Sequence, residues 1–281
     1  MTMSKNLIIT FQAFIVLTAL SSCSMDNKGN MEGDSTLCQF NNFKQEKMYQ
    51  YADEEGKTFF IDNKVTAFWP VTINGKPCPE LQKALLLAMT DSAELNTLDL
   101  AMDAILAPNT YLDMDSSTLK QVDTITIESD NLSSSEYRIR LQDMGDRLLT
   151  YHIHYYAFMA RAAHGIYNNS YVTYDLKTEK TVALDDIIAD TTLLRDVTLK
   201  SIKQTYDYGI DDLFLPDNGL LPRPSDFYFE DSVLHLVYQV YEIASYAQGM
   251  IDAPIYPYML KPEEMKRLYT PYGLELIDYT E

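Results

Sequence analysis

The clearest alternation of apolar and polar positions in the chain runs through residues 148–158. Its odd positions from 149 to 157 are apolar or aromatic and would share one face of a strand, while the even positions would share the other. Residues 122–128 and 136–142 show the same period of two and are also rich in β-branched or aromatic side chains. The pattern therefore predicts a sheet after residue 120.

Two helices are predicted before this sheet. Apolar residues recur at helical spacing after Pro79, a residue type that suits the first turn of a helix. Thr97 offers an N-cap for the second helix. Short strands at 57–61 and 65–73 precede the helices, and Pro70 should confine the second strand to a sheet edge or a break.

The remaining predicted elements indicate the fold class. The pattern predicts a helix entered through 184–187, a short helix after Lys261, and strands at 171–176, 227–230, 233–241 and 255–260. Helices grouped between runs of strands, without βαβ alternation, predict an α+β fold with a mainly antiparallel sheet and packed helices. Two lobes, divided near residues 130–145, are compatible with this order.

The first 22 residues have the layout of an export signal. Lys5 is their only charge, an apolar run covers 7–20, and two serines precede Cys23. The run is shorter than the roughly 20 residues that a spanning helix needs. Leu20-Ser21-Ser22-Cys23 also resembles a bacterial lipobox, so we predict that Cys23 is lipidated and becomes the first mature residue.

The lipoprotein interpretation predicts how the chain is divided into segments and where the protein is located. We predict a lipoprotein signal peptide at 1–22, a polar flexible tether at 23–36, an N-terminal α+β lobe at 37–144 and a C-terminal domain at 145–281. Two or three acyl chains would hold the protein on a membrane where a single chain would not. The predicted location is the cell envelope, on the periplasmic face or the outer surface, with membrane contact through the lipid anchor only.

The net charge of the chain disfavours some classes of binding partner. Lys and Arg number 22 against 41 Asp and Glu, a formal charge of −19. Removing residues 1–22, which carry only Lys5, leaves 21 basic and 41 acidic side chains and a charge of −20. Such a surface repels nucleic acid and anionic bilayers and attracts basic proteins or cations, so no nucleic acid partner is predicted.

Only two cysteines, Cys38 and Cys78, follow Cys23. An even pair in an exported protein permits a disulfide. Nothing in the sequence brings the two Cα atoms together, so a Cys38–Cys78 bridge and two separate buried thiols are both open.

Motifs for common chemistry are absent from the sequence. There is no phosphate-binding glycine loop, nucleophile elbow or zinc-protease motif, and no cofactor is predicted. His152 and His154 would lie on one face of a strand, but a metal site needs further ligands, so no metal is predicted either. The 21 tyrosines are more unusual, because a flat apolar ring with a hydroxyl suits protein or sugar recognition.

Two segments resemble a known family. The first reads Ala162-Ala163-His164-Gly165, followed by Tyr171-x-x-Tyr174-Asp175-Leu176 and Leu184-Asp185-Asp186-Ile187. The second reads Tyr241-Glu242-Ile243-Ala244-Ser245-Tyr246-Ala247-x-Gly249, followed by Ile255-x-Pro257-Tyr258. Across 145–262 the chain resembles the domain of unknown function at the extracytoplasmic C-terminus of the anti-sigma factor RsiV and beside the deacetylase in PdaC. Trp69-Pro70 and the helices that follow resemble, more weakly, its companion N-terminal domain.

The resemblance implies a binding or sensing module, and its RsiV-like relatives suggest lysozyme or a peptidoglycan-type glycan as ligand. The chain departs from the family pattern at Arg161-Ala162, Glu179 and Ser245, where the family has a glycine pair, a glycine and a proline. We predict ligand contacts from polar and aromatic residues of the two segments: Arg161, His164, Tyr241, Glu242 and Tyr246.

Two other functions stay as hypotheses. The first is a glycan-active enzyme, which would need two carboxyl groups facing each other in a pocket, one with a raised pKa. Adjacent carboxylates such as Asp185-Asp186 do not create that geometry, since glycosidases hold the two groups about 5 to 9.5 Å apart across a cleft. The second is a structural component of an envelope complex, which a large exposed apolar patch would favour.

Overall fold

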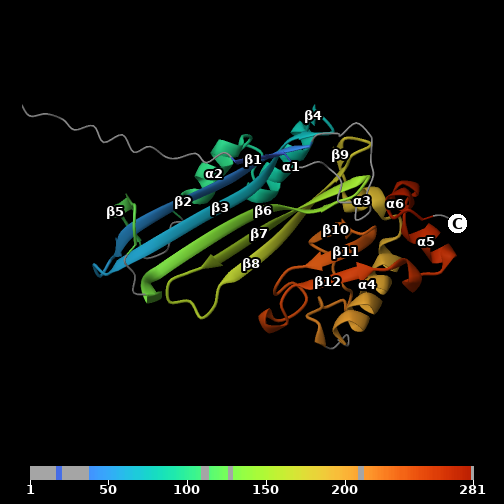
Figure 1. The fold of residues 1–281 in the computed structure, drawn as a ribbon. Coiled ribbons are helices and arrows are strands. Elements are labelled where there is room, and N and C mark those ends of the chain that lie inside the picture. Colours follow the sequence, from blue (N-terminus) through green and yellow to red (C-terminus); the bar gives the residue numbers. More distant parts are fainter. Residues whose placement is uncertain (1–16, 21–37, 109–113, 126–128, 208–211, 280–281) are drawn as a thin grey trace, which may run out of the picture.

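A computed structural model of the chain describes residues 17–20, 38–108, 114–125, 129–207 and 212–279. It shows a large sheet, a small sheet and two groups of helices (Figure 1). Most neighbouring strands are antiparallel, which confirms the predicted α+β class. Among the described residues, no helix has the length and apolarity needed to cross a bilayer.

The large sheet forms the long body in Figure 1. Its main path runs β1-β2-β3-β6-β7-β8-β9, with β4 paired to β3 and β5 paired to β2. Among the strand pairs that the structure describes, only β3–β6 is parallel. The strands are β1 Leu17–Leu20, β2 Gln39–Asp53, β3 Thr58–Ile73, β4 Lys76–Pro77, β5 Met114–Val122, β6 Leu132–Met144, β7 Leu148–Phe158, β8 Ile166–Asp175 and β9 Lys180–Thr181.

Two predicted helices, α1 Pro79–Thr90 and α2 Leu98–Leu106, cover one face of the large sheet. α1 begins at a proline, and Thr97 caps α2 by accepting the backbone N–H of Leu100 at 3.3 Å. Their apolar sides form one core with the odd-numbered face of β7, including Leu149, Tyr151 and Ile153. The alternation in β7 thus places the helices on the face that the sequence predicts to be apolar.

The C-terminal part builds a second core. Its small sheet is β10 Asp226–Glu230, β11 Val233–Tyr238 and β12 Ile251–Ile255, and its helices are α3 Leu184–Ile187, α4 Thr191–Tyr206, α5 Pro262–Leu268 and α6 Pro271–Leu276. Short 3₁₀ turns occur at η1 Ser129–Asn131, η3 Tyr246–Gln248 and η4 Pro257–Met259. α4 packs along β12, and buried side chains of these helices and strands share one core.

The small sheet docks on the face of β7 and β8 opposite to α1 and α2. The hydroxyl of Thr150 donates to the carbonyl of Phe229 at 3.2 Å, and the backbone N–H of Tyr171 donates to Asp226 Oδ2 at 2.7 Å. A boundary at residues 144/145 falls in the turn between β6 and β7, which are hydrogen-bonded neighbours. The N-terminal and C-terminal parts are therefore joined by one continuous sheet.

Several strand expectations need correction. β2 was not predicted, although it spans 15 residues, and β5 lies at 114–122 and not at 122–128, of which 126–128 are outside the described residues. The predicted strand at 255–260 is replaced by β12 at 251–255 and a 3₁₀ turn. Pro70 lies inside β3, where the β2–β3 register shifts so that Phe40 pairs with Pro70 and Gln39 with Thr72. This bulge lets the strand continue past a residue that has no N–H.

The N-terminal predictions fall almost wholly outside the description. Cys23, the tether and most of the signal segment are not described, while residues 17–20 form β1 beside β2. Cys78 is a free, buried thiol, so the Cys38–Cys78 bridge that the sequence left open is not formed. The Cys78 Sγ points to the carbonyl of Val71 at 3.8 Å, and burial raises its pKa to about 11.

Candidate binding surface

Three of the five predicted contact residues lie together. The ring of His164 stacks on that of Tyr246, with centroids 4.1 Å apart, and the Tyr241 hydroxyl lies 3.4 Å from His164 Nε2. The Tyr241 and Tyr246 rings are 5.6 Å apart. Two segments almost 80 residues apart in the sequence, the β7–β8 turn and the loop after β11, therefore form one cluster.

The other two predicted residues, Arg161 and Glu242, make contacts within the fold. The guanidinium of Arg161 lies over the ring of Phe59 at 4.7 Å from its centroid, a cation–π contact with β3. Glu242 Oε2 accepts the backbone N–H of Gln239 at 2.7 Å and so closes the turn in which it lies. Both were predicted as polar residues of the two family-like segments, and the place of a turn residue in the sequence does not fix where its side chain points.

Sequence reasoning missed two tyrosines of this cluster. Tyr167 meets Tyr246 edge to face at 6.1 Å, and Tyr156 lies directly opposite Tyr167 in the β7–β8 pairing. A Cβ atom on Gly165 would come within 2.5 Å of the Tyr156 hydroxyl, so this glycine leaves room for the ring. Extending the predicted strand at 171–176 back to residue 166 would have placed Tyr167 on the same face as Tyr156.

We call this cluster the aromatic surface: Tyr156, His164, Tyr167, Tyr241 and Tyr246. His164 and Tyr241 are exposed, the latter with 54% of its surface accessible, and Tyr156 is 37% exposed. Tyr241 has a φ of 67°, a left-handed conformation that is uncommon for a bulky residue and typical of constrained functional positions. The rings are thus held partly in solvent, and not buried in a core.

The loop that carries Tyr241 and Tyr246 is fixed to β8 by an amide side chain. Gln239 Nε2 donates to the carbonyl of Asn169 at 2.6 Å, and the Asn169 N–H donates to Gln239 Oε1 at 3.0 Å. The backbone N–H of Met250 donates to the hydroxyl of Tyr167 at 3.2 Å. These contacts hold both ends of the loop against the strand that bears Tyr167.

Two histidines of β7, next to the aromatic surface, share a hydrogen-bonding partner. His152 Nε2 and His154 Nδ1 lie 2.7 and 3.0 Å from Asn169 Oδ1, and Arg140 Nε donates to His152 Nδ1 at 3.0 Å. His152 therefore donates from Nε2 and accepts at Nδ1 as a neutral imidazole, consistent with burial, which lowers its pKa to about 4. Both histidines share an amide, and the described residues contain no group of three side chains suited to a metal.

A column of stacked rings continues from His152 into the small sheet. The centroid distances are 4.8 Å from His152 to Tyr171, 4.4 Å from Tyr171 to Tyr228, and 4.4 Å from Tyr228 to His235. Asp252 ends the column by accepting from the Tyr228 hydroxyl at 2.6 Å and by contacting His235 Nδ1 at 2.9 Å. Burial raises the pKa of both tyrosines, so they stay protonated and the column is a structural support.

Part of the aromatic surface lies in a segment that matches a known family. Residues 177–256 match the DUF3298 family, a protein family of unknown function. The DUF3298 region starts after β8 and ends after β12, so it contributes Tyr241 and Tyr246 to the aromatic surface, while the other three members precede it.

A solved structure of a DUF3298 protein shares the fold. A member from Bacteroides fragilis superposes with a TM-score of 0.55 at 14% identity, over 85% of this chain and 96% of its own. A DUF3298 protein from Pseudomonas aeruginosa gives a TM-score of 0.47 at 15% identity, over 83% and 95% of the two chains. None of the curated proteins is significantly similar in sequence.

Two described aspartates have a carboxyl group with a raised pKa, and both lie outside the aromatic surface. Burial raises the pKa of Asp226 to about 7, but both of its oxygens accept backbone N–H groups, from Tyr171 and Phe227 at 2.7 Å. Burial also raises the pKa of Asp143, which lies in a β6 segment near Glu230 and Asp231. Neither group is a member of the aromatic surface.

Proposed function

We propose that this protein is a lipid-anchored extracytoplasmic binding module that contacts its partner through the aromatic surface. The supporting observation is the grouping of His164, Tyr241 and Tyr246, with two further tyrosines, at a solvent-exposed site built from two distant segments. Aromatic rings that are already fixed lose little conformational entropy on binding and offer both an apolar face and a hydrogen-bonding edge.

Lysozyme is the first partner we propose. A charge near −20 on the mature chain would steer a strongly basic protein to this surface, and the RsiV-like sequence resemblance points to the same partner. Attraction of this kind raises the association rate and weakens as salt screens it. Fixed tyrosines would then supply the short-range contacts that charge alone does not.

The test is a calorimetric titration of the full-length protein, in detergent, with lysozyme at low and high salt. We expect saturable binding that weakens with salt, and a Tyr241→Ala/Tyr246→Ala variant that binds about 10-fold or more weakly, because central aromatic anchors carry much of an interface energy. Tyr258→Ala is the matched control, since Tyr258 is 79% exposed and stacks on Tyr256, outside the aromatic surface. Absence of saturable binding at low salt, or equal binding by the double variant, would refute the proposal.

Anchoring is tested separately. In cells fed an alkyne-bearing fatty acid, we expect the label on the membrane-associated wild-type chain and its loss in Cys23→Ser, because only a thiol can form the thioether that anchors the protein. Cys78→Ala should keep the label, since Cys78 is buried in the folded domain. A chain that retains residues 1–22 in the cytosol and carries no acyl mass would contradict the anchor.

A further inference from the structure

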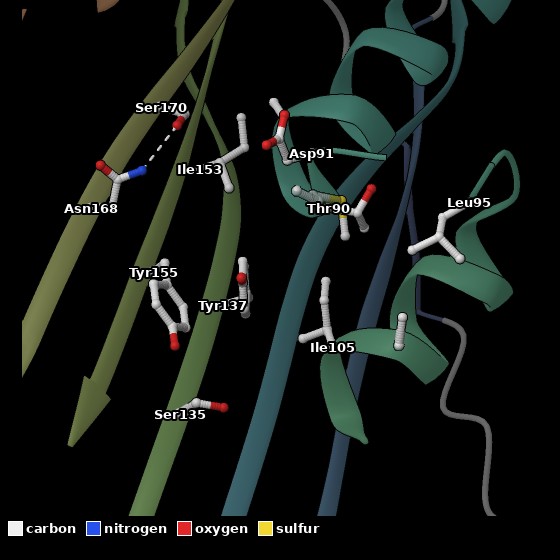
Figure 2. A pocket seen from close by; sticks show the side chains of 13 residues that line it. Thr90, Asp91, Leu95, Ile105, Ser135, Tyr137, Ile153, Tyr155, Asn168 and Ser170 are labelled. Atoms are coloured by element: carbon white, nitrogen blue, oxygen red, sulfur yellow. Dashed lines mark hydrogen bonds between the residues drawn. The ribbon is translucent and has the colours of Figure 1, made fainter. Parts of the chain in front are cut away.

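A pocket of about 360 Å³ lies on the face of β7 and β8 that points away from the aromatic surface. Side chains alternate between the two faces of a strand, so Tyr155 and Asn168 point into the pocket while their neighbours Tyr156 and Tyr167 belong to the aromatic surface. Figure 2 shows α1 and α2 on one side of the pocket and β6 to β8 on the other. Its volume falls in the range of small-molecule sites, about 300–1,000 Å³.

The sheet side of the pocket carries two tyrosines. The rings of Tyr137 and Tyr155 lie 4.5 Å apart, tilted by 35°. Burial and the neighbouring Tyr155 raise the pKa of Tyr137 to about 12, so its hydroxyl keeps its proton. Within the described ranges that hydroxyl has no hydrogen-bond partner, and it is free to donate to or accept from a ligand.

Further polar groups surround these rings without any basic side chain. Asn168 Nδ2 donates to Ser170 Oγ at 3.4 Å, which leaves the Asn168 carbonyl open. Asp91, just after α1, adds a carboxylate that makes no ion pair with a described residue. Among the described residues that line the pocket there is no lysine, arginine or histidine, so an anionic ligand would meet a negative charge and no compensating positive one.

Apolar side chains complete the wall. Ile153 lies in the sheet, Leu95 and Ile105 lie on the helix side, and Figure 2 shows all three at the pocket. Ser135 adds no free donor, because its hydroxyl donates to the buried Asn63 Oδ1 at 2.8 Å. The pocket therefore combines apolar contacts with hydroxyl, amide and carboxylate groups, a mixture that suits a ligand with both apolar faces and hydroxyl donors.

We propose that this pocket binds an uncharged saccharide unit. Sugar C–H faces would pack on the Tyr137–Tyr155 pair and on Ile153, and sugar hydroxyls would donate to Asp91 and Asn168. The site lies on the opposite side of the sheet from the aromatic surface, so it is independent of the proposed lysozyme contact.

The experiment uses the full-length protein and three probes: cellobiose, di-N-acetylchitobiose and glucuronate. Saturation-transfer NMR titrations should show saturable binding of at least one neutral disaccharide and binding of glucuronate that is about 10-fold or more weaker, because Asp91 would repel it. Asp91→Asn and Tyr137→Phe each remove one polar function while keeping side-chain shape, and each should weaken neutral-sugar binding by about 5-fold or more. Tyr241→Ala/Tyr246→Ala should bind the sugar like wild type, which separates this site from the aromatic surface.

Three results would overturn the proposal. They are failure of both neutral disaccharides to saturate, glucuronate binding as tight as theirs, and wild-type sugar affinity in both Asp91→Asn and Tyr137→Phe. A chemical-shift comparison of each variant with wild type shows that the fold is intact, so a loss of binding can be assigned to the pocket. Loss of lysozyme binding with sugar binding retained would count against the proposed function alone.

Discussion

Replacement of Asp175 by alanine is expected to lower the free energy of unfolding by about 3–5 kcal/mol, the range for breaking a buried ion pair. Asp175 ends β8, and its side chain is fully buried. Its oxygens accept from the backbone N–H of Lys177 at 2.8 Å, the Tyr272 hydroxyl at 2.8 Å and Arg147 Nη2 at 3.3 Å. Alanine would leave the Lys177 N–H and the Tyr272 hydroxyl without this acceptor and would remove one link between α6 and the end of the large sheet.

The protonation state of Asp175 supports this expectation. Burial opposes its ionisation, but the Lys177 N–H, the Tyr272 hydroxyl and Arg147 together outweigh burial and hold its pKa below the usual value. The stability it contributes is therefore present above the pKa of an unfolded aspartate, about 4, and is lost as the pH falls through the lower folded pKa.

Urea denaturation at pH 7 measures this effect directly. Asp185→Ala is the control, because Asp185 is 74% exposed and pairs with Arg223 at the surface, where ion pairs contribute about 1 kcal/mol or less. A loss of under about 1 kcal/mol in Asp175→Ala would show that this cluster does not anchor α6.

Asp226 is expected to make stability depend on pH in the opposite direction. Burial raises its pKa to about 7, against the two backbone N–H groups that favour its ionised form. The folded state therefore retains a proton that the unfolded chain releases above pH about 4. The stability contributed by this group is complete below that pH and falls by about 4 kcal/mol as the pH rises through 7.

The measurement compares wild type with Asp226→Ala by urea denaturation between pH 4.5 and 7.5. Only the difference between the two proteins isolates this group, because many other carboxyl groups titrate in both. Wild type should lose stability relative to the variant as the pH rises. Asp146→Ala, in the exposed β6–β7 turn, should give a difference that does not change with pH. The raised pKa would be excluded if the stability of wild type relative to Asp226→Ala stayed constant or increased as the pH rises.

Local patterns predicted the elements whose own sequence carries a clear periodic or capping signal. β7 begins and ends where the alternation does, and α1 and α2 begin at the predicted proline and N-cap. β2 was missed because charged and amide side chains fill most of its half-exposed positions, and its pairing with β3 supplies the order that its own sequence does not indicate. Pairing partners far along the chain override weak local preference.

The candidate site was predicted in part for a similar reason. The family-like segments contain His164, Tyr241 and Tyr246, and the fold brings them together. Arg161 has a φ of 64°, and its guanidinium lies over the ring of Phe59. The backbone conformation of a turn sets the direction of its side chains, so closeness in sequence to the cluster residues does not place Arg161 among them. Tyr137 and Asp91 could not be connected from the sequence at all, since α1 and β6 meet only through tertiary packing.

The parallel contact between β3 and β6 also sets an order of assembly. Residues 74–131 separate the two strands, and parallel neighbours cannot be joined by a tight hairpin. β2–β3 and β6–β7–β8 can each close locally, whereas the contact between β3 and β6 closes a longer loop and costs more chain entropy. Until β6 pairs with it, β3 has an unsatisfied backbone edge over residues 60–67, at which other strands can associate.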